Sequence, residues 1–118
     1  MPRRGFGELE ARVMRILWEA EQPLTSREVW MSFDDEDRPA RTTLLTILSR
    51  LEDKELLVRE AHAGGALFRP AEDEAQHAAS SMAGMLDQVS NREAALAYFA
   101  GNLTDDDLAS LRKAFGTP

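Results

Sequence analysis

The sequence predicts a mostly α-helical chain with one small β-hairpin, divided into two domains at residues 1–71 and 72–118. Apolar residues recur at helical spacing in several separate segments on both sides of that boundary. A pair of short β-prone runs around a Gly-Gly turn occurs once, at the end of the first domain. At 118 residues, the chain has mass for one modest core or two small ones.

The first two helices are expected over residues 8–20 and from Thr25 to about Phe33. The first shows apolar residues on one helical face, and Gln22-Pro23 ends it. The second has a strong start signal, because Thr25 and Glu28 have the spacing of a capping box. Two further apolar residues stand where a hydrophobic staple would hold the start of this helix. Two helices separated by a short break are therefore expected at the start of the chain.

The third helix, expected over Arg41–Lys54, carries the most informative surface of the chain. Its apolar stripe consists of Leu44, Ile47, Leu48 and Leu51. Its opposite face consists of Thr42, Thr46 and Ser49, flanked by Thr43, Leu45 and Arg50. Long charged residues normally fill a solvated helix face, because they combine charge with good helix propensity. Short hydroxyls with basic residues at the margins suit insertion into a DNA major groove instead. The alternative is a half-buried helix packed against a neighbouring element.

A β-hairpin is expected after the third helix, from the runs Leu56–Ala61 and Ala66–Pro70 around a Gly-Gly turn. The basic residues of its rim are Arg59, His62 and Arg69. A helix-turn-helix followed by a basic hairpin is a winged-helix arrangement, in which helix and wing share the contacts with the duplex. The hairpin also suits simple closure of a small core, and the two interpretations are compatible.

The second domain is expected to hold three short helices that pair with those of a second copy. One begins near Asp73, a second at a capping box of Ser90 and Glu93, and a third at one of Thr104 and Asp107. Fewer than 50 residues rarely enclose a self-sufficient core, so their apolar stripes need a partner. Packing on the first domain is the alternative to a homodimer. The expected dimerisation residues are Met82, Met85, Leu86, Leu96, Phe99, Leu108, Leu111 and Phe115.

Composition argues against an enzyme. The chain has no Cys, which removes disulfides and thiol chemistry, and its two His residues lack a nucleophile or paired acid at persuasive spacing. Neither a nucleotide-binding motif nor a metal-ligand cluster is present, so no cofactor and no metal are expected. Trp18 and Trp30 fall within helical apolar patterns and are interpreted as packing residues. No apolar run is long enough to insert into a membrane, and a cytoplasmic location is expected.

Net charge leaves DNA binding open. The chain carries a formal charge of −7, but 11 of its 14 Lys and Arg residues lie in residues 1–71. An acidic protein can bind DNA through a local basic strip, while its overall charge suppresses non-specific adhesion.

The motifs together resemble the BlaI/MecI family of winged-helix repressors, the penicillinase repressor family, over nearly the whole length. The third helix carries the most specific part of the resemblance. The matching segments are Gly7–Glu10, Val13-Met14, Leu17-Trp18, Leu24–Val29, Arg41–Leu44 with Thr46, Leu48, Arg50-Leu51, Lys54 and Leu56, Gly65–Pro70, and Ala94–Phe99 with Leu108 and Leu111-Arg112.

The resemblance implies a homodimeric repressor that occupies a palindromic operator. In characterised relatives, a membrane sensor for β-lactams triggers proteolytic cutting of the repressor, which by position would fall near Tyr98 and Phe99 here. The absence of Cys departs from the copper-responsive branch of the family, whose sensing tail uses cysteines. Glu55 stands where many relatives have Gly, so the turn into the wing is expected to differ in detail.

The expected DNA contacts divide by chemistry. Thr42, Thr43, Thr46 and Ser49 would supply hydroxyls, and Leu45 would meet a thymine methyl group. Arg41 and Arg50 would hold phosphates at the margins of the helix, and Arg59, His62 and Arg69 would act from the wing. Two alternatives remain open: a winged-helix module that binds protein, and a repressor relieved by a small-molecule ligand. A regulatory protease is a third expected partner, beside operator DNA and the second copy.

Overall fold

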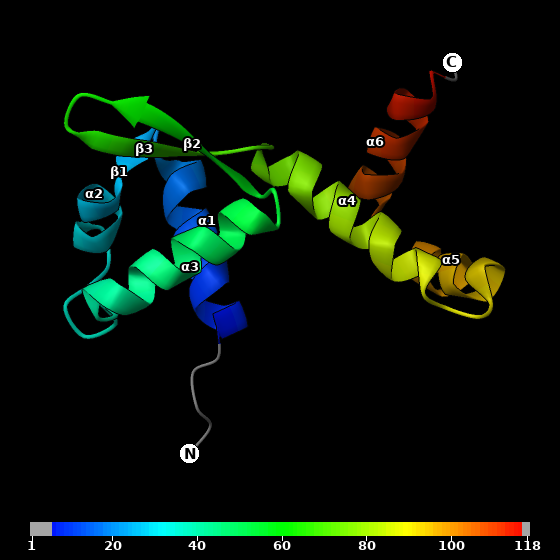
Figure 1. Ribbon diagram of the computed structural model, residues 1–118. Helices are drawn as coiled ribbons and strands as arrows, with labels where there is room; N and C mark the ends of the chain where they lie inside the picture. The colour runs from blue at the N-terminus through cyan, green and yellow to red at the C-terminus, as the bar shows by residue number, and fades with distance from the viewer. Residues whose placement is uncertain (1–5, 117–118) are drawn as a thin grey trace. The chain divides into compact units, whose positions relative to one another are not determined.

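Three helices and a three-stranded sheet form the first of two units, Met1–His77, in the computed structural model, which describes residues 6–116 (Figure 1). The elements in order are α1 (Phe6–Glu19), β1 (Leu24–Thr25), α2 (Ser26–Met31), α3 (Arg41–Asp53), β2 (Leu57–His62) and β3 (Gly65–Pro70). Helix α2, a turn and helix α3 form a helix-turn-helix, and β2 with β3 form the hairpin that follows it. The predicted mostly helical fold with a winged helix-turn-helix is confirmed.

The hairpin pairs in antiparallel register from Leu57 opposite Pro70 to His62 opposite Gly65. Two residues, Ala63 and Gly64, form its turn, and Gly65 has a φ of 125°, which favours glycine. Strand β1 extends the sheet to three strands by pairing with β3, Leu24 opposite Phe68. The sequence did not indicate β1, because two residues are too few for an alternating pattern.

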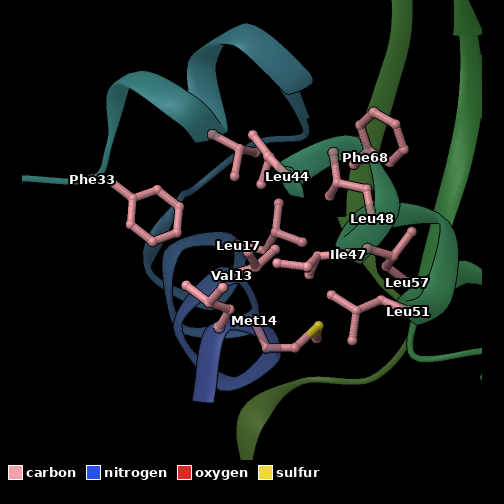
Figure 2. Close-up of a cluster of buried hydrophobic side chains, with 12 residues drawn as sticks. Val13, Met14, Leu17, Phe33, Leu44, Ile47, Leu48, Leu51, Leu57 and Phe68 are labelled. Carbon is pink, nitrogen blue, oxygen red and sulfur yellow. The ribbon is translucent and has the colours of Figure 1, made fainter. Parts of the chain in front are cut away.

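One apolar core joins the helices of this unit to its sheet, and Figure 2 shows its side chains converging from α1, α3 and the strands. The four residues of the predicted stripe on α3 are all at most 1% exposed. The other buried core residues are Leu9, Val13, Met14, Leu17, Val29, Phe33, Leu57 and Phe68. Full burial of one such aliphatic or aromatic side chain contributes about 1.5–3 kcal/mol, so the stripe fixes which face of α3 remains outside.

The turn between α3 and the wing is a Schellman motif. Glu55 has a φ of 63°, in the left-handed region. Its N–H donates to the carbonyl of Glu52, and the N–H of Leu56 donates to that of Leu51, both at 2.9 Å. The expectation that Glu55 would alter this turn is therefore wrong. Two backbone hydrogen bonds and the packing of Leu56 on the core outweigh the cost of a left-handed Glu.

The second unit, Ala78–Pro118, contains most of α4 (Glu74–Asp87), then α5 (Arg92–Gly101) and α6 (Asp105–Phe115). The capping box of Thr104 and Asp107 is confirmed at the start of α6. The one expected from Ser90 and Glu93 is wrong. Asn91 caps α5 instead, because its Oδ1 accepts a 2.9 Å hydrogen bond from the N–H of Ala94.

The units divide between His77 and Ala78, inside α4, whereas the sequence suggested a boundary after residue 71. The first turn of α4 contacts α1. The indole of Trp18 donates to the carbonyl of Glu72 at 3.0 Å, and its ring lies 5.3 Å from that of His77. Arg15 forms a 2.9 Å ion pair with Glu74. These contacts explain why the first turn of α4 belongs to the first unit. None of the helices in residues 6–116 combines the length and apolarity needed to cross a bilayer.

Candidate nucleic-acid interface

The outer face of α3 gathers the residues that the sequence singled out. Because Leu44, Ile47, Leu48 and Leu51 face the core, the residues between them face solvent. The exposed ones are Arg41, Thr42, Leu45, Thr46, Ser49 and Arg50, while Thr43 is half-buried at the edge. Leu45, at 48% exposed, is the large apolar side chain of this face. The face is therefore small, mostly polar and bounded by a guanidinium near each end.

The start of α3 is suited to an anion. Ala40 at the N-cap offers no side-chain hydrogen bond, and the first turn contains no acidic residue. The N–H groups of a first helical turn have no partner within the helix, and they carry a partial positive charge. Arg41 adds a full positive charge at the same end and is exposed. This combination of backbone donors and a guanidinium is complementary to a phosphate group.

The hydroxyl group of Thr46 is available to an incoming group only as a hydrogen-bond acceptor. Its Oγ1 donates a 3.1 Å hydrogen bond to the carbonyl of Thr42 within the helix. Because the hydroxyl proton is engaged there, the oxygen offers only lone pairs to an incoming group. In the major groove, the matching donors are the amino groups of adenine and cytosine.

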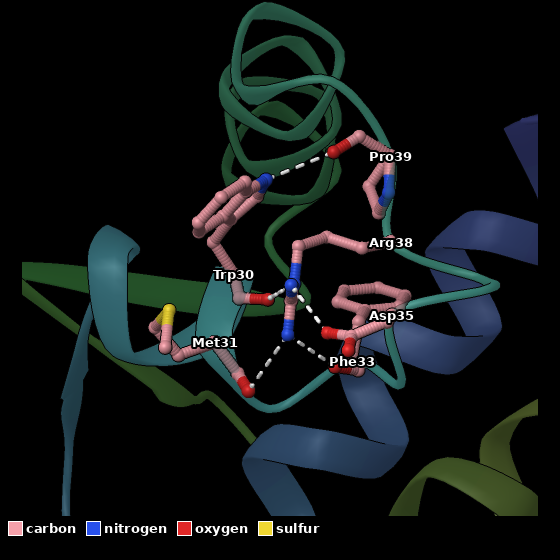
Figure 3. Close-up of polar contacts among 6 residues, drawn as sticks. All are labelled: Trp30, Met31, Phe33, Asp35, Arg38 and Pro39. Atoms are coloured by element: carbon pink, nitrogen blue, oxygen red, sulfur yellow. Dashed lines mark hydrogen bonds and ion pairs between the residues drawn. The ribbon is translucent and has the colours of Figure 1, made fainter.

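Arg38 organises the turn between α2 and α3, as Figure 3 shows. Its guanidinium donates to the carbonyls of Trp30 at 2.9 Å and Phe33 at 2.8 Å, and more weakly to that of Met31 at 3.5 Å. It also pairs with Asp35 at 2.9 Å. The carbonyls at the end of a helix lack intrahelical partners, and Arg38 supplies donors to them. The carbonyl of Trp30 also accepts from the N–H of Phe33 at 3.3 Å. Helix α2 ends at Met31, where Arg38 binds these carbonyls. The sequence predicted that the helix would continue two residues further, to about Phe33.

Besides packing, Trp30 has a polar role that the sequence did not indicate. It packs against the core, as expected, but its indole N–H donates to the carbonyl of Pro39 at 2.8 Å (Figure 3). Its ring also faces the guanidiniums of Arg38, 4.7 Å from the ring centroid, and of Arg41, 5.7 Å away. An Arg-Pro pair ahead of a helix indicated only a turn. No pattern in the sequence indicated that the guanidinium would reach back to α2.

The wing is basic but already paired with acids. Arg59 lies 3.2 Å from Glu52 and covers the ring of Phe68 at 5.1 Å, and Arg69 lies 2.6 Å from Glu60. His62 is exposed at the end of β2. Both arginines are nearly half exposed, so these pairs are surface ion pairs, which are typically worth under about 1 kcal/mol. A phosphate can therefore compete with Glu52 and Glu60 for them.

The second unit presents an apolar groove rather than a polar site. The groove has a volume of about 350 Å³. Its lining residues are Met82, Ala83, Met85, Leu86, Val89, Ala95, Leu96 and Phe99. Among the expected dimerisation residues, Leu86 and Leu108 are half-buried, and the other six are exposed, up to 74% for Phe115. Tyr98 is 80% exposed on α5. Within residues 6–116 there is no group of three His, Cys, Asp or Glu side chains placed to hold a metal ion.

Comparison with known structures supports the fold. The Helicobacter pylori ferric uptake regulator Fur, whose structure was described as revealing three functional metal-binding sites, matches with a TM-score of 0.54 at 19% identity. The match covers 59% of this chain. It covers 49% of the Fur chain, so this chain spans about half of that structure. At that identity the likeness concerns the fold alone.

Comparison by sequence identifies the family. Two regulators, each described as transcriptional regulator BlaI and from Mycobacterium tuberculosis strains CDC 1551 and H37Rv, are each 31% identical over 112 residues. That alignment covers 92% of this chain and 81% of each regulator. The model of the penicillinase repressor family matches residues 6–116. Match and alignment span both units, so this chain belongs to the penicillinase repressor family of transcriptional regulators.

Proposed function

We propose that this protein is a repressor that binds a palindromic DNA operator as a homodimer. The outer face of α3 carries the proposal, because it joins short hydroxyls and one apolar side chain between Arg41 and Arg50. A protein-binding face would expose more large apolar or aromatic residues. The family, whose members regulate transcription, supports the same assignment.

In this proposal α3 lies in the major groove. Arg41 and Arg50 hold phosphates and set the register, while the residues between them meet base edges. The base-reading residues would be Thr42, Thr43, Leu45, Thr46 and Ser49. The wing adds contacts from Arg59, His62 and Arg69, with the two arginines exchanging their acidic partners for phosphates.

The second copy would supply the second half-site reader. Helices α4 to α6 leave no described side chain of the second unit buried, and their groove is lined by apolar side chains. Short helices of this kind need tertiary packing to be stable. A two-fold partner would bury the same surface on both copies and would match a two-fold operator.

Fluorescence anisotropy tests the proposal, with a labelled fragment from upstream of the protein's own gene at near-physiological salt. Excess scrambled DNA removes non-specific binding. We expect saturable binding of two protein molecules per site and steep weakening as salt is raised. Failure there and on genome-wide selected fragments would contradict DNA binding. A winged domain directed at a protein partner would then be the better assignment.

Relief of repression by proteolysis is the second part of the proposal. The bond between Tyr98 and Phe99 lies inside α5, and both side chains are exposed. A protease binds its substrate in an extended form, so α5 must unwind locally before cleavage. We expect cleavage during induction in the native host to separate the helices of the second unit and to lower operator affinity. An intact protein band throughout induction would contradict this route.

A further inference from the structure

We propose that Trp30 is a positioning residue that holds the guanidinium of Arg41 ready for a DNA phosphate. The inference rests on the proposed function, since it concerns how one of its phosphate contacts is prepared. Trp30 itself, half-buried on α2, would not touch the DNA. It would act through Arg41, the first residue of α3.

Three contacts tie Trp30 to the start of α3. Its indole N–H donates to the carbonyl of Pro39 at 2.8 Å, two residues before Arg41 (Figure 3). Its ring lies under the guanidinium of Arg41, 5.7 Å from the centroid. The same ring lies 4.7 Å from the guanidinium of Arg38, whose four hydrogen bonds close the turn. One side chain therefore links the end of α2, the turn and the first residue of α3.

The position of Arg41 makes such support necessary. A cation at a helix N-terminus is repelled by the helix dipole, and the first turn of α3 has no acidic residue to offset this. A long, flexible side chain also loses rotamer freedom when it binds a partner. The negative face of an indole attracts a guanidinium and restricts where it lies. Trp30 thus compensates the repulsion and prepares the charge before DNA arrives.

The test compares the salt dependence of operator binding among variants that remain folded by circular dichroism. Arg41→Ala removes the phosphate-binding guanidinium itself. Trp30→Leu keeps apolar bulk but removes the aromatic face and the indole N–H, whereas Trp30→Phe keeps an aromatic face. Trp18→Leu is the matched control, because it removes a half-buried indole whose hydrogen bond and ring contact involve Glu72 and His77.

We expect Arg41→Ala to lower the slope of log affinity against log salt by about 0.9 for each phosphate that the variant no longer neutralises. Trp30→Leu should lower it similarly, and the double variant no further than Arg41→Ala alone. Trp30→Phe should restore most of the slope, and Trp18→Leu should leave it unchanged. A wild-type slope in Trp30→Leu, or slope reductions that add in the double variant, would overturn the inference.

Two further outcomes separate this inference from the proposed function. An unchanged slope in Arg41→Ala, with specific binding by the wild type, would overturn the inference and leave the repressor assignment standing. Absence of specific binding by the wild type would overturn both. If Trp30→Leu does not fold, nuclear magnetic resonance of the wild type decides. Upfield ring-current shifts of the Arg41 side-chain protons support the inference, and unshifted protons overturn it.

Discussion

The backbone N–H of Leu56 donates to the carbonyl of Leu51 at 2.9 Å, which ties the first residue after the turn to the last turn of α3. Leu51 is fully buried and Leu56 packs against the same core. Helix α3 and the wing are therefore joined by a hydrogen-bonded turn that packs on the core. Glu55 stands between them with a φ of 63°, and this geometry is the origin of the first prediction.

Replacing Glu55 with Gly should stabilise the first unit. A left-handed conformation costs a residue with a Cβ atom about 1–2 kcal/mol, part of which is offset by the greater chain entropy of Gly. We expect a net gain of about 0.5–1 kcal/mol in the free energy of unfolding, measured by urea denaturation. Asp53→Gly, in the last turn of α3, is the control and should destabilise. A decrease in stability in Glu55→Gly would contradict the assigned cap.

Replacing Arg38 with Lys should destabilise the helix-turn-helix. Lysine keeps the charge but lacks the planar fork that reaches several carbonyls at once. Since the Arg38 side chain is only 19% exposed, the abandoned carbonyls of Trp30 and Phe33 are not freely hydrated. We expect a loss of about 1–3 kcal/mol in thermal denaturation. Arg27→Lys, at an exposed position on α2, should change little. Equal stability of the two variants would show that charge alone is sufficient.

Replacing Thr46 with Ala should change which operators the protein prefers. In the proposed complex its hydroxyl oxygen, whose proton is donated to Thr42, would accept from the amino group of adenine or cytosine. Removal of a good base contact costs about 1–3 kcal/mol of discrimination. Thr46→Ser keeps the hydroxyl and should retain the preference. The measurement is competition between the operator and single-base variants. Unchanged affinity together with unchanged preference in Thr46→Ala would exclude the proposed role.

Replacing Met85 with Glu should prevent dimer formation. Met85 is 72% exposed and lines the apolar groove that the second copy would cover. A charge buried there without a partner costs several kcal/mol, so we expect self-association to weaken at least about 100-fold in sedimentation equilibrium. Gln88→Glu introduces the same charge at an exposed position that does not line the groove, and it should still associate. A wild-type protein that is monomeric at micromolar concentration would contradict the dimer itself.

Sequence patterns found those parts of the fold that depend on neighbours along the chain. The buried stripe of α3 follows from helical spacing, and the caps at Thr25 and Thr104 follow from a partner three residues away. The caps also mark where sequence reasoning becomes ambiguous. Ser90 and Asn91 are both good N-cap residues, and the spacing of Ser90 and Glu93 favoured the one that does not cap α5.

Contacts that depend on the folded turn could not be predicted. Arg38 and Arg41 follow the turn, whereas the carbonyls bound by Arg38 and the ring contacted by Arg41 precede it, and no spacing rule places the two sides together. The outer face of α3 was predictable in full, because it is the complement of a buried stripe. The pairing of Arg59 with Glu52 and of Arg69 with Glu60 was not predictable, because it depends on strand register and packing.

The second unit has consequences for how the repressor responds to its own abundance. Among its described residues, no side chain is buried within one copy. If these helices gain their core by pairing, their folding is a second-order reaction, and the folded fraction depends on the number of molecules in the cell. Halving synthesis would then reduce operator-competent pairs by up to about fourfold, and single copies with frayed helices would be degraded first. Such coupling would turn a gradual fall in expression into an abrupt release of the operator.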